Sequence, residues 1–278
     1  MQIGLRIHDA AKLPLEERLA VIHEQGFTCG HLALSKVLDK KMAAPEALTP
    51  GYAMYLKRLF AKNELDIAVL GCYLNLANPN AEQLKEIVEK YKAHIRFASH
   101  LGCGVVGTET GALNEAYKYE PRSHSEEALE IFINNLRPVV EYAEKMGVIF
   151  AIEPVFKHIV CNPVRARRVL DEINSPNLQI ILDPVNLLDI SNYQNQVQIV
   201  EEAIELLGKD VAVVHIKDYV VKDDKLESVA AGMGKMNYDA IMKFVKEKKP
   251  YIHTTLENTI PENAVQAKEY ILKLWEEA

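Results

Sequence analysis

The sequence predicts an α/β fold, specifically a closed (β/α)8 or TIM barrel, from three observations. Eight short apolar segments alternate with eight helical segments along the 278 residues. Alternating strands and helices favour a parallel sheet, and eight such units in a chain of this length favour a closed barrel, which typically has about 250 residues. No linker rich in Pro or Gly and no low-complexity segment divides the chain. We therefore expect residues 1–278 to form one domain.

The expected strands are short runs of apolar and β-branched residues, several of which end in polar side chains. They are residues 3–7, 31–35, 66–75, 105–110, 148–155, 178–185, 211–218 and 251–257. Helices are expected where apolar residues recur with helical spacing, at 15–25, 50–62, 79–101, 123–146, 163–173, 193–207, 237–249 and 263–278. Asn78 is the predicted N-cap of the third helix because Pro79 follows it.

Three long segments, 39–49, 111–122 and 221–237, each follow an expected strand. In a barrel, the loops that follow strands cover the face that carries the active site. We therefore expect all three loops to surround the site.

Composition excludes several classes of partner and location. The net charge of −7 and pI near 5.8 give no general attraction for phosphate backbones, so nucleic acid is not expected as a partner. No apolar run approaches the ~20 residues of a membrane span. Charges interrupt the first ten residues and no long apolar region follows them, so a signal peptide is not expected. The four cysteines show no paired spacing, which is typical of free thiols in a cytoplasmic protein.

Four of the last expected strands end in side chains that can bind a metal ion, namely Glu153, Asp183, His215 and Glu257. Their separations of 30, 32 and 42 residues each correspond to about one βα unit, which places them side by side on one rim. A single acidic residue at a strand end is usually a cap or a solvated loop residue, but four in register are harder to explain in that way. Three carboxylates repel one another strongly, and one divalent ion would resolve this repulsion. A mixed oxygen and imidazole set suits Mn, Mg, Co or Zn.

The segment 211–218 places further ionisable groups at this rim. Strand side chains alternate, so His215 and Lys217 should point to one side and Asp218 to the other.

The motifs around these residues resemble those of xylose isomerase-like barrels, the sugar phosphate isomerase/epimerase superfamily. The resemblance covers essentially the whole chain, and the motifs that carry it are Ala151-Ile-Glu-Pro154, Leu182-Asp-Pro-Val-Asn186, Val214-His-Ile-Lys-Asp218, Gly232-Met-Gly-Lys-Met-Asn-Tyr-Asp239 and Thr255-Leu-Glu257. It implies one divalent ion bound by Glu153, Asp183, His215 and Glu257. It also implies that Glu153 and Glu257 transfer the proton next to a carbonyl through a metal-stabilised enediolate.

One position departs from the family pattern. The family often has a histidine three residues after the aspartate of the sixth strand, where this chain has Asn186. In endonuclease IV that histidine helps to hold a cluster of zinc ions, so Asn186 and the acidic pI disfavour a nuclease. Asn186 can still bind a substrate hydroxyl, but it cannot transfer a proton.

Other polar residues near the expected strand ends are candidate substrate-binding groups. They are Lys217, His158, Glu109 and Tyr73, with Asn75 and His8 as further candidates. Each also has a structural explanation: a salt bridge for Lys217, a surface position for His158 and a loop cap for Glu109.

The leading hypothesis is a metal-dependent isomerase or epimerase of a sugar, sugar phosphate or cyclitol ketone. The first alternative is an inosose-type dehydratase, which would abstract the same proton and then expel a β-hydroxyl. A phosphodiesterase resembling endonuclease IV and a non-catalytic binding barrel are weaker alternatives. The expected partner is a small sugar or cyclitol, and a homo-oligomer is compatible with the sequence.

Overall fold

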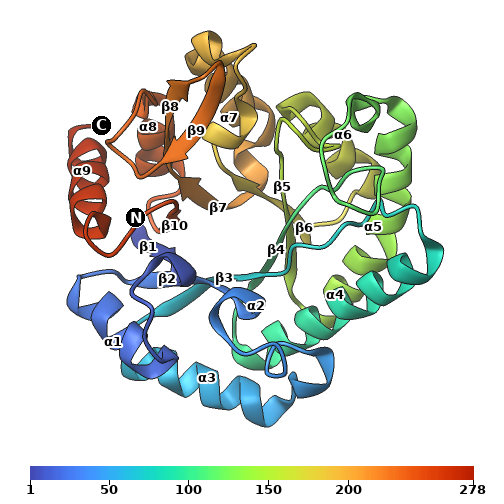
Figure 1. The fold of residues 1–278 in the computed structure, drawn as a ribbon, viewed down its shortest axis with the longest axis horizontal. Helices are drawn as coiled ribbons and strands as arrows, with labels where there is room; N and C mark the ends of the chain where they lie inside the picture. The colour runs from blue at the N-terminus through green and yellow to red at the C-terminus, as the bar shows by residue number, and fades with distance from the viewer.

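The computed structural model describes residues 1–278 and contains a closed barrel of parallel strands surrounded by helices (Figure 1). Around the barrel the order is β1-β10-β7-β6-β5-β4-β3-β2, so the first and last strands pair and close it. This confirms the predicted (β/α)8 fold. The barrel strands are β1 (Gln2–Arg6), β2 (Cys29–Ala33), β3 (Asp66–Gly71), β4 (Val105–Glu109), β5 (Ile149–Glu153), β6 (Leu178–Leu182), β7 (Val211–Ile216) and β10 (His253–Leu256).

The helices form a ring around the barrel (Figure 1). They are α1 (Leu15–Glu24), α2 (Leu34–Val37), α3 (Pro50–Lys62), α4 (Ala81–Leu101), α5 (Glu126–Met146), α6 (Pro163–Ile173), α7 (Gln196–Leu207), α8 (Asp239–Lys248) and α9 (Ala264–Glu277). Short 3₁₀ helices, Pro121–His124 and Tyr193–Asn195, precede α5 and α7 where the sequence predicted earlier helix starts. None of the helices combines the length and apolar character that crossing a membrane requires.

The start of α4 differs from the prediction. Asn80 is the N-cap, and its side chain accepts the backbone N–H of Gln83 at 3.2 Å. Asn78 was predicted to be the cap, but its side chain instead accepts the N–H of Asn80 at 2.9 Å. This contact is a local Asx turn across Pro79, and it delays the helix by two residues.

Apolar residues fill two layers. The larger core lies between the strands and the surrounding helices and includes Leu5, Phe97, Phe132 and Phe150. A smaller cluster fills the barrel interior with Cys29, Ala68, Val69, Ala151, Ile181 and Val213. The interior is therefore a packed floor, and polar groups can gather only above it.

The segment after β7 contains a hairpin that the sequence reasoning did not predict. The strands β8 (Asp218–Lys222) and β9 (Lys225–Val229) pair antiparallel. Asp223 and Asp224 form the turn with φ angles of 50° and 53°, the left-handed conformation that two-residue hairpin turns require. The expected strand 211–218 accordingly ends at Ile216, because the chain turns out of the barrel there.

We propose that the whole barrel is one domain, and limited trypsin digestion tests this. The first cuts should fall at Lys40 and Lys41 and at Lys222 and Lys225, because these exposed lysines lie in a loop and beside a hairpin turn. Mass spectrometry of early fragments identifies the sites. Early release of two separately folded halves would contradict a single domain, because β1 and β10 must stay paired.

Candidate active site

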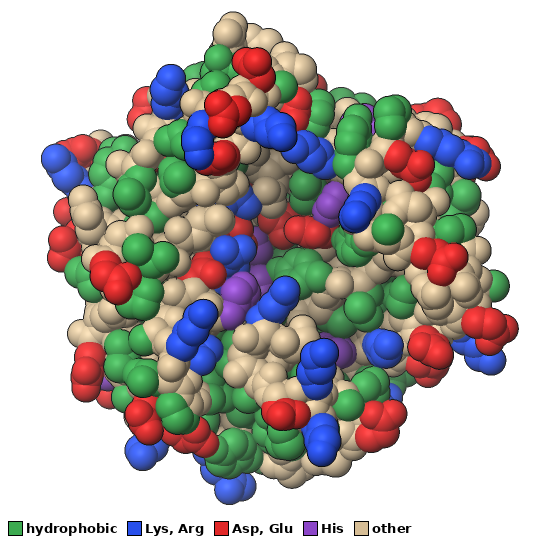
Figure 2. Space-filling model, viewed as in Figure 1, with side chains coloured by type: hydrophobic (Ala, Val, Ile, Leu, Met, Phe, Trp, Pro, Cys, Tyr) green, Lys and Arg blue, Asp and Glu red, His purple; other side chains and the backbone are tan.

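A cavity of about 380 Å³ opens at the carboxyl end of the barrel strands. In the space-filling view, histidine, acidic and basic side chains gather in the hollow at the centre of the molecule (Figure 2). The cavity is lined almost entirely by polar residues, which come from every barrel strand or the loop after it: Arg6, His8, His31, Ala33, Lys36, Tyr73, Glu109, Glu153, Asn186, Lys217 and Glu257.

The alternation of β7 places its polar residues in this cavity. Val213 belongs to the barrel interior, so His215 and Lys217, two and four residues later, follow on the same side. Asp218 points away, as predicted. Its carboxylate accepts the backbone N–H groups of Tyr219, Gly232, Gly234 and Met236, and so it organises the loop after β7.

His215 lies between the two glutamates that were predicted to transfer protons. Its Nδ1 is 3.3 Å from Glu153 Oε1 and 3.1 Å from Glu257 Oε1. The glutamates come from β5 and from the end of β10, which β6 and β7 separate around the barrel. Carboxylates from two separate strand ends therefore meet at one nitrogen of the imidazole.

Lys217 is the buried counter-ion of the site. Its Nζ lies 2.7 Å from Asp183 Oδ2 and 3.0 Å from Glu257 Oε2. The hydroxyl of Tyr238 donates to the backbone carbonyl of Lys217 at 2.9 Å and helps to hold this segment. Lys217 thus forms the salt bridge that the sequence left open, and it also lines the cavity.

Asn186 and Asp183 are tied together by the turn after β6. Asp183 Oδ1 accepts the backbone N–H groups of Val185 and Asn186, at 2.9 and 3.2 Å. The Asn186 side chain donates to Glu153 Oε1 at 2.7 Å. Asn186 therefore orients Glu153 while it lines the cavity.

The four residues expected to bind a metal ion are brought together in two overlapping groups. Donor atoms of Glu153, Asp183 and His215 all lie within 4.8 Å of one another, and so do those of His31, His215 and Glu257. His215 Nε2 is buried without a hydrogen-bond partner. The donor set combines imidazole nitrogen with carboxylate oxygen, which suits a divalent ion such as Zn or Mn.

Burial and neighbouring charges together shift the pKa values of the ionisable groups in the site. Although burial opposes it, Lys217, His215 and Arg6 hold the pKa of Glu257 well below its usual range. Burial likewise opposes the charged form of Lys217, but Asp183 and Glu257 raise its pKa. For Glu109, burial and then the charge of Glu153 raise the pKa to about 7. Glu257 and Lys217 are thus a charged pair at neutral pH, whereas Glu109 is partly protonated.

The sequence reasoning missed three charged or titratable residues that line the cavity, His31, Arg6 and Lys36. His31 is 1 % exposed, its ring stacks on His215 with centroids 5.2 Å apart, and its Nε2 lies 3.0 Å from the Tyr73 hydroxyl. Arg6 Nη1 lies 3.4 Å from Glu257 Oε2. His31 was expected to start its strand, but β2 begins at Cys29, so the histidine sits further along it.

Of the other candidate substrate-binding residues, some line the cavity and others do not. Tyr73 and Glu109 line the cavity, as expected of substrate-binding residues. His158 does not line it and instead packs against Tyr117, with its Nδ1 3.8 Å from Glu109 Oε2. Asn75 donates to the backbone carbonyls of Ala112 and Asn114 and so braces the loop after β4.

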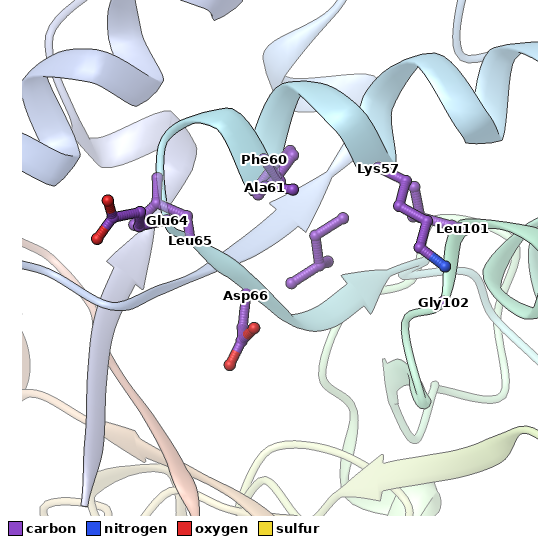
Figure 3. Close-up of a pocket in the computed structure, with 9 residues that line it drawn as sticks. Lys57, Phe60, Ala61, Glu64, Leu65, Asp66, Leu101 and Gly102 are labelled. Atoms are coloured by element: carbon purple, nitrogen blue, oxygen red, sulfur yellow. The ribbon is translucent and has the colours of Figure 1, made fainter.

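Another cavity, of about 340 Å³, lies near the start of β3 between α3 and the end of α4 (Figure 3). Its polar residues are Lys57, Glu64 and Asp66, and apolar residues make up most of the remaining wall. The amino end of barrel strands is the face that serves stability rather than catalysis. We therefore place the candidate active site at the carboxyl end.

The fold and this rim of acidic and histidine side chains define a class of barrel. Residues 19–274 match the family model described as xylose isomerase-like TIM barrel. The chain therefore belongs to the xylose isomerase-like TIM barrel family.

The individual proteins that this chain resembles are less than 30% identical to it. A probable L-ribulose-5-phosphate 3-epimerase, UlaE, of Mycoplasma pneumoniae is 29% identical over 169 residues, which are 57% of this chain and 52% of that protein. The match thus spans about half of the relative's length. A D-tagatose 3-epimerase-like protein has a TM-score of 0.76 at 24% identity, over 100% of this chain and 99% of the other. A structure of the IolI protein with a bound zinc atom has a TM-score of 0.76 at 18% identity, with the same coverage of each chain. At these identities the two structures show a shared fold.

Replacing Glu109 with glutamine should change how stability depends on pH. An unfolded glutamate has a pKa of about 4.3. The folded value of about 7 means that stability is fully present below the unfolded pKa and is lost as pH rises through 7. The side chain is 33% exposed, so water screens part of the effect. Between pH 4 and 8, we expect the free energy of unfolding of the wild type to fall by about 1–2 kcal/mol more than that of Glu109→Gln.

Urea unfolding of the metal-stripped proteins at both pH values measures this difference. Glu130→Gln, at an exposed position on α5, is the matched control and should follow wild type. Parallel stability curves for wild type and Glu109→Gln would show that Glu109 ionises normally.

Proposed function

We propose that this protein is a divalent-metal-dependent epimerase or isomerase of a sugar, sugar phosphate or cyclitol ketone. In this proposal Glu153 and Glu257 move the proton next to the carbonyl. One divalent ion, which could be Mn, Mg, Co or Zn, is held by Glu153, Asp183, His215 and Glu257. The substrate contacts come from Tyr73, Glu109, Asn186 and Lys217. His158 acts only through Glu109.

The observation that carries the proposal is the meeting of two carboxylates from separate strands at one imidazole nitrogen. Glu153 and Glu257 both line the cavity, and each approaches His215 Nδ1 from its own strand end. Inverting a C–H centre requires a base on one face of the substrate and an acid on the other, whereas moving a proton between adjacent carbons can use a single base on one face. A carboxylate that removes the proton and a protonated partner that returns it would supply that pair.

The charges of the donor set fit a divalent ion. Glu153, Asp183 and Glu257 contribute three negative charges and Lys217 one positive charge, so an M²⁺ ion would bring the sum to zero. Asp183 and His215 are 1 % and 0 % exposed and lie beneath the cavity wall, deep enough to hold an ion below a substrate. When bound, such an ion supplies a Lewis acid that stabilises negative charge on oxygen.

The remaining side chains orient the reacting groups. Asn186 occupies one oxygen of Glu153 and leaves the other oxygen free to accept a proton. Lys217 donates to Glu257 Oε2 at 3.0 Å, while Glu257 Oε1 lies 3.1 Å from His215 Nδ1. Lys217 also lines the cavity, where its ammonium group could donate to a substrate oxygen. Few apolar groups line the cavity, which suits a substrate with many hydroxyls.

The described activities of the relatives support this proposal. The Mycoplasma pneumoniae relative is a probable 3-epimerase of L-ribulose 5-phosphate. The structural neighbours include a D-psicose 3-epimerase and a 3-keto-D-glucoside 4-epimerase. All of these reactions change the configuration at a sugar carbon.

A dehydratase of an inosose-type ketone is the second candidate, and Glu109 favours it. Loss of a β-hydroxyl needs an acid that is still protonated near neutral pH. The pKa of Glu109, which burial raises to about 7, would provide one beside Glu153. Formation of a conjugated product from an inosose would favour the dehydratase over the epimerase.

Replacing His215 with alanine should remove the metal ion. We expect this variant to bind the ion at least about 10- to 100-fold more weakly, since even an outer-shell change has that effect. Elemental analysis after dialysis measures occupancy. His100→Ala, at an exposed position of α4, is the control and should keep a metal ratio near one. Equal occupancy in wild type and His215→Ala would remove His215 from the site.

Replacing either Glu153 or Glu257 with glutamine should slow proton exchange. Glutamine keeps the size of the side chain but removes the base, which commonly contributes about 10²- to 10⁴-fold in rate. We expect a loss of that order for each variant on a panel of ketoses and inososes in deuterated water. NMR detects deuterium at the carbon next to the carbonyl.

Metal occupancy must be measured in the same samples, because loss of the ion would give the same result. Glu130→Gln serves again as the control. A fully metallated Glu257→Gln that exchanges at the wild-type rate would leave Glu257 with a structural role only.

A further inference from the structure

Acidic and basic side chains both line the cavity, and they come from several strand ends. Glu109 and Glu153 line the wall at the ends of β4 and β5. Arg6 and Lys36 line the wall at the end of β1 and in α2, after β2. A negatively charged part of a substrate would be repelled at the first wall. At the second wall Glu257 lies 3.4 Å from Arg6 and offsets its charge, so the attraction there comes from Lys36.

The cation of this wall that is free to bind a ligand is Lys36. Arg6 is already engaged, because its Nε lies 2.8 Å from Asp9 Oδ2 and its Nη1 lies 3.4 Å from Glu257 Oε2. Lys36 forms no salt bridge and no side-chain hydrogen bond with any residue of the chain. It is exposed and lines the cavity, where an incoming anion would reach it.

His8 provides an independent indication of a ligand in the same place. Its side chain is 22% exposed and lines the cavity, but its Nδ1 is buried and has no hydrogen-bond partner. A polar nitrogen buried without a partner is costly, and a ligand that bonds to it removes that cost. Lys36 lies in α2, which contacts the short segment Ile7–Asp9 that contains His8, and both residues line the same cavity.

We propose that Lys36 and His8 form a subsite for a terminal phosphate group, so that the natural substrate is a phosphorylated ketose. The inference rests on the proposed function for the remainder of the substrate, which would extend from this subsite towards Glu153 and Glu257. Lys36 supplies a compact positive charge for the phosphate, and His8 supplies a hydrogen bond. The phosphate subsite thereby selects substrates by charge.

Calorimetry on the metal-loaded protein tests the subsite with two probes, L-ribulose 5-phosphate and L-ribulose. The dissociation constant of the first should be smaller, and Lys36→Ala should reduce the ratio of the two constants about tenfold, as expected for loss of a hydrogen bond to a charged group. Lys36→Arg should restore most of the preference. Lys40→Ala removes a nearby exposed lysine that does not line the cavity, and it should leave the ratio unchanged. An unchanged ratio in Lys36→Ala would overturn the proposal.

Inorganic phosphate separates this inference from the proposed reaction. Its binding, followed by ³¹P NMR, should weaken in Lys36→Ala and in His8→Phe, whether or not the protein turns over any ketose. Phosphate bound only to the metal ion would be insensitive to both variants and would overturn the subsite. Acetate that competes as well as phosphate would overturn the assignment to a phosphate. Absence of proton exchange with every ketose, together with phosphate binding that depends on Lys36, would refute the epimerase but not the subsite.

Discussion

The site depends on the contact of one buried ammonium group with two buried carboxylates. Lys217 Nζ lies within 3.0 Å of both Asp183 and Glu257 in a region that water hardly reaches. Ionised groups without partners are expensive to bury, so three carboxylates at one rim require positive charge nearby. Lys217 supplies part of this charge, and the proposed ion would supply the rest. Removing Lys217 would break the ion pair of buried Asp183 and leave Glu257 with Arg6 and His215 as its partners, and breaking a buried ion pair costs more than the pair contributes.

This requirement for charge balance explains why the polar groups occupy one end of the barrel. Apolar side chains such as Val213 and Ile181 fill the interior below the site, and they exclude water and keep the local dielectric low. Parallel strands then deliver their next inward residues to the same level. The hydrogen bonds from Asn186 to Glu153 and from Lys217 to Glu257 fix both glutamates that we propose to transfer protons before a substrate arrives.

Some polar residues that follow strands hold loops in place and do not line the cavity. Asp218 gathers four backbone N–H groups of the loop after β7, and Asn75 holds the loop after β4. Both residues are polar and stand just past a strand, as the site residues do. The same sequence signal therefore marks a ligand-facing side chain at Glu153 and a structural one at Asp218, and the direction of the side chain distinguishes them.

The sequence by itself determined the barrel and the rim on which Glu153, Asp183, His215 and Glu257 meet. The alternation of strand side chains and the similar length of the βα units can be read from the sequence. Parallel pairing then places the ends of neighbouring strands at the same level of the barrel. Only the tertiary structure brought His31, Arg6 and Lys36 into the cavity with these residues and turned Asn75 and His158 away from it. These positions depend on barrel closure between β1 and β10, and on loop conformations beyond the strand ends, which no periodic pattern encodes. The hairpin β8–β9 was missed because Asp223 and Asp224 give a weaker turn signal than Asn-Gly or Asp-Gly.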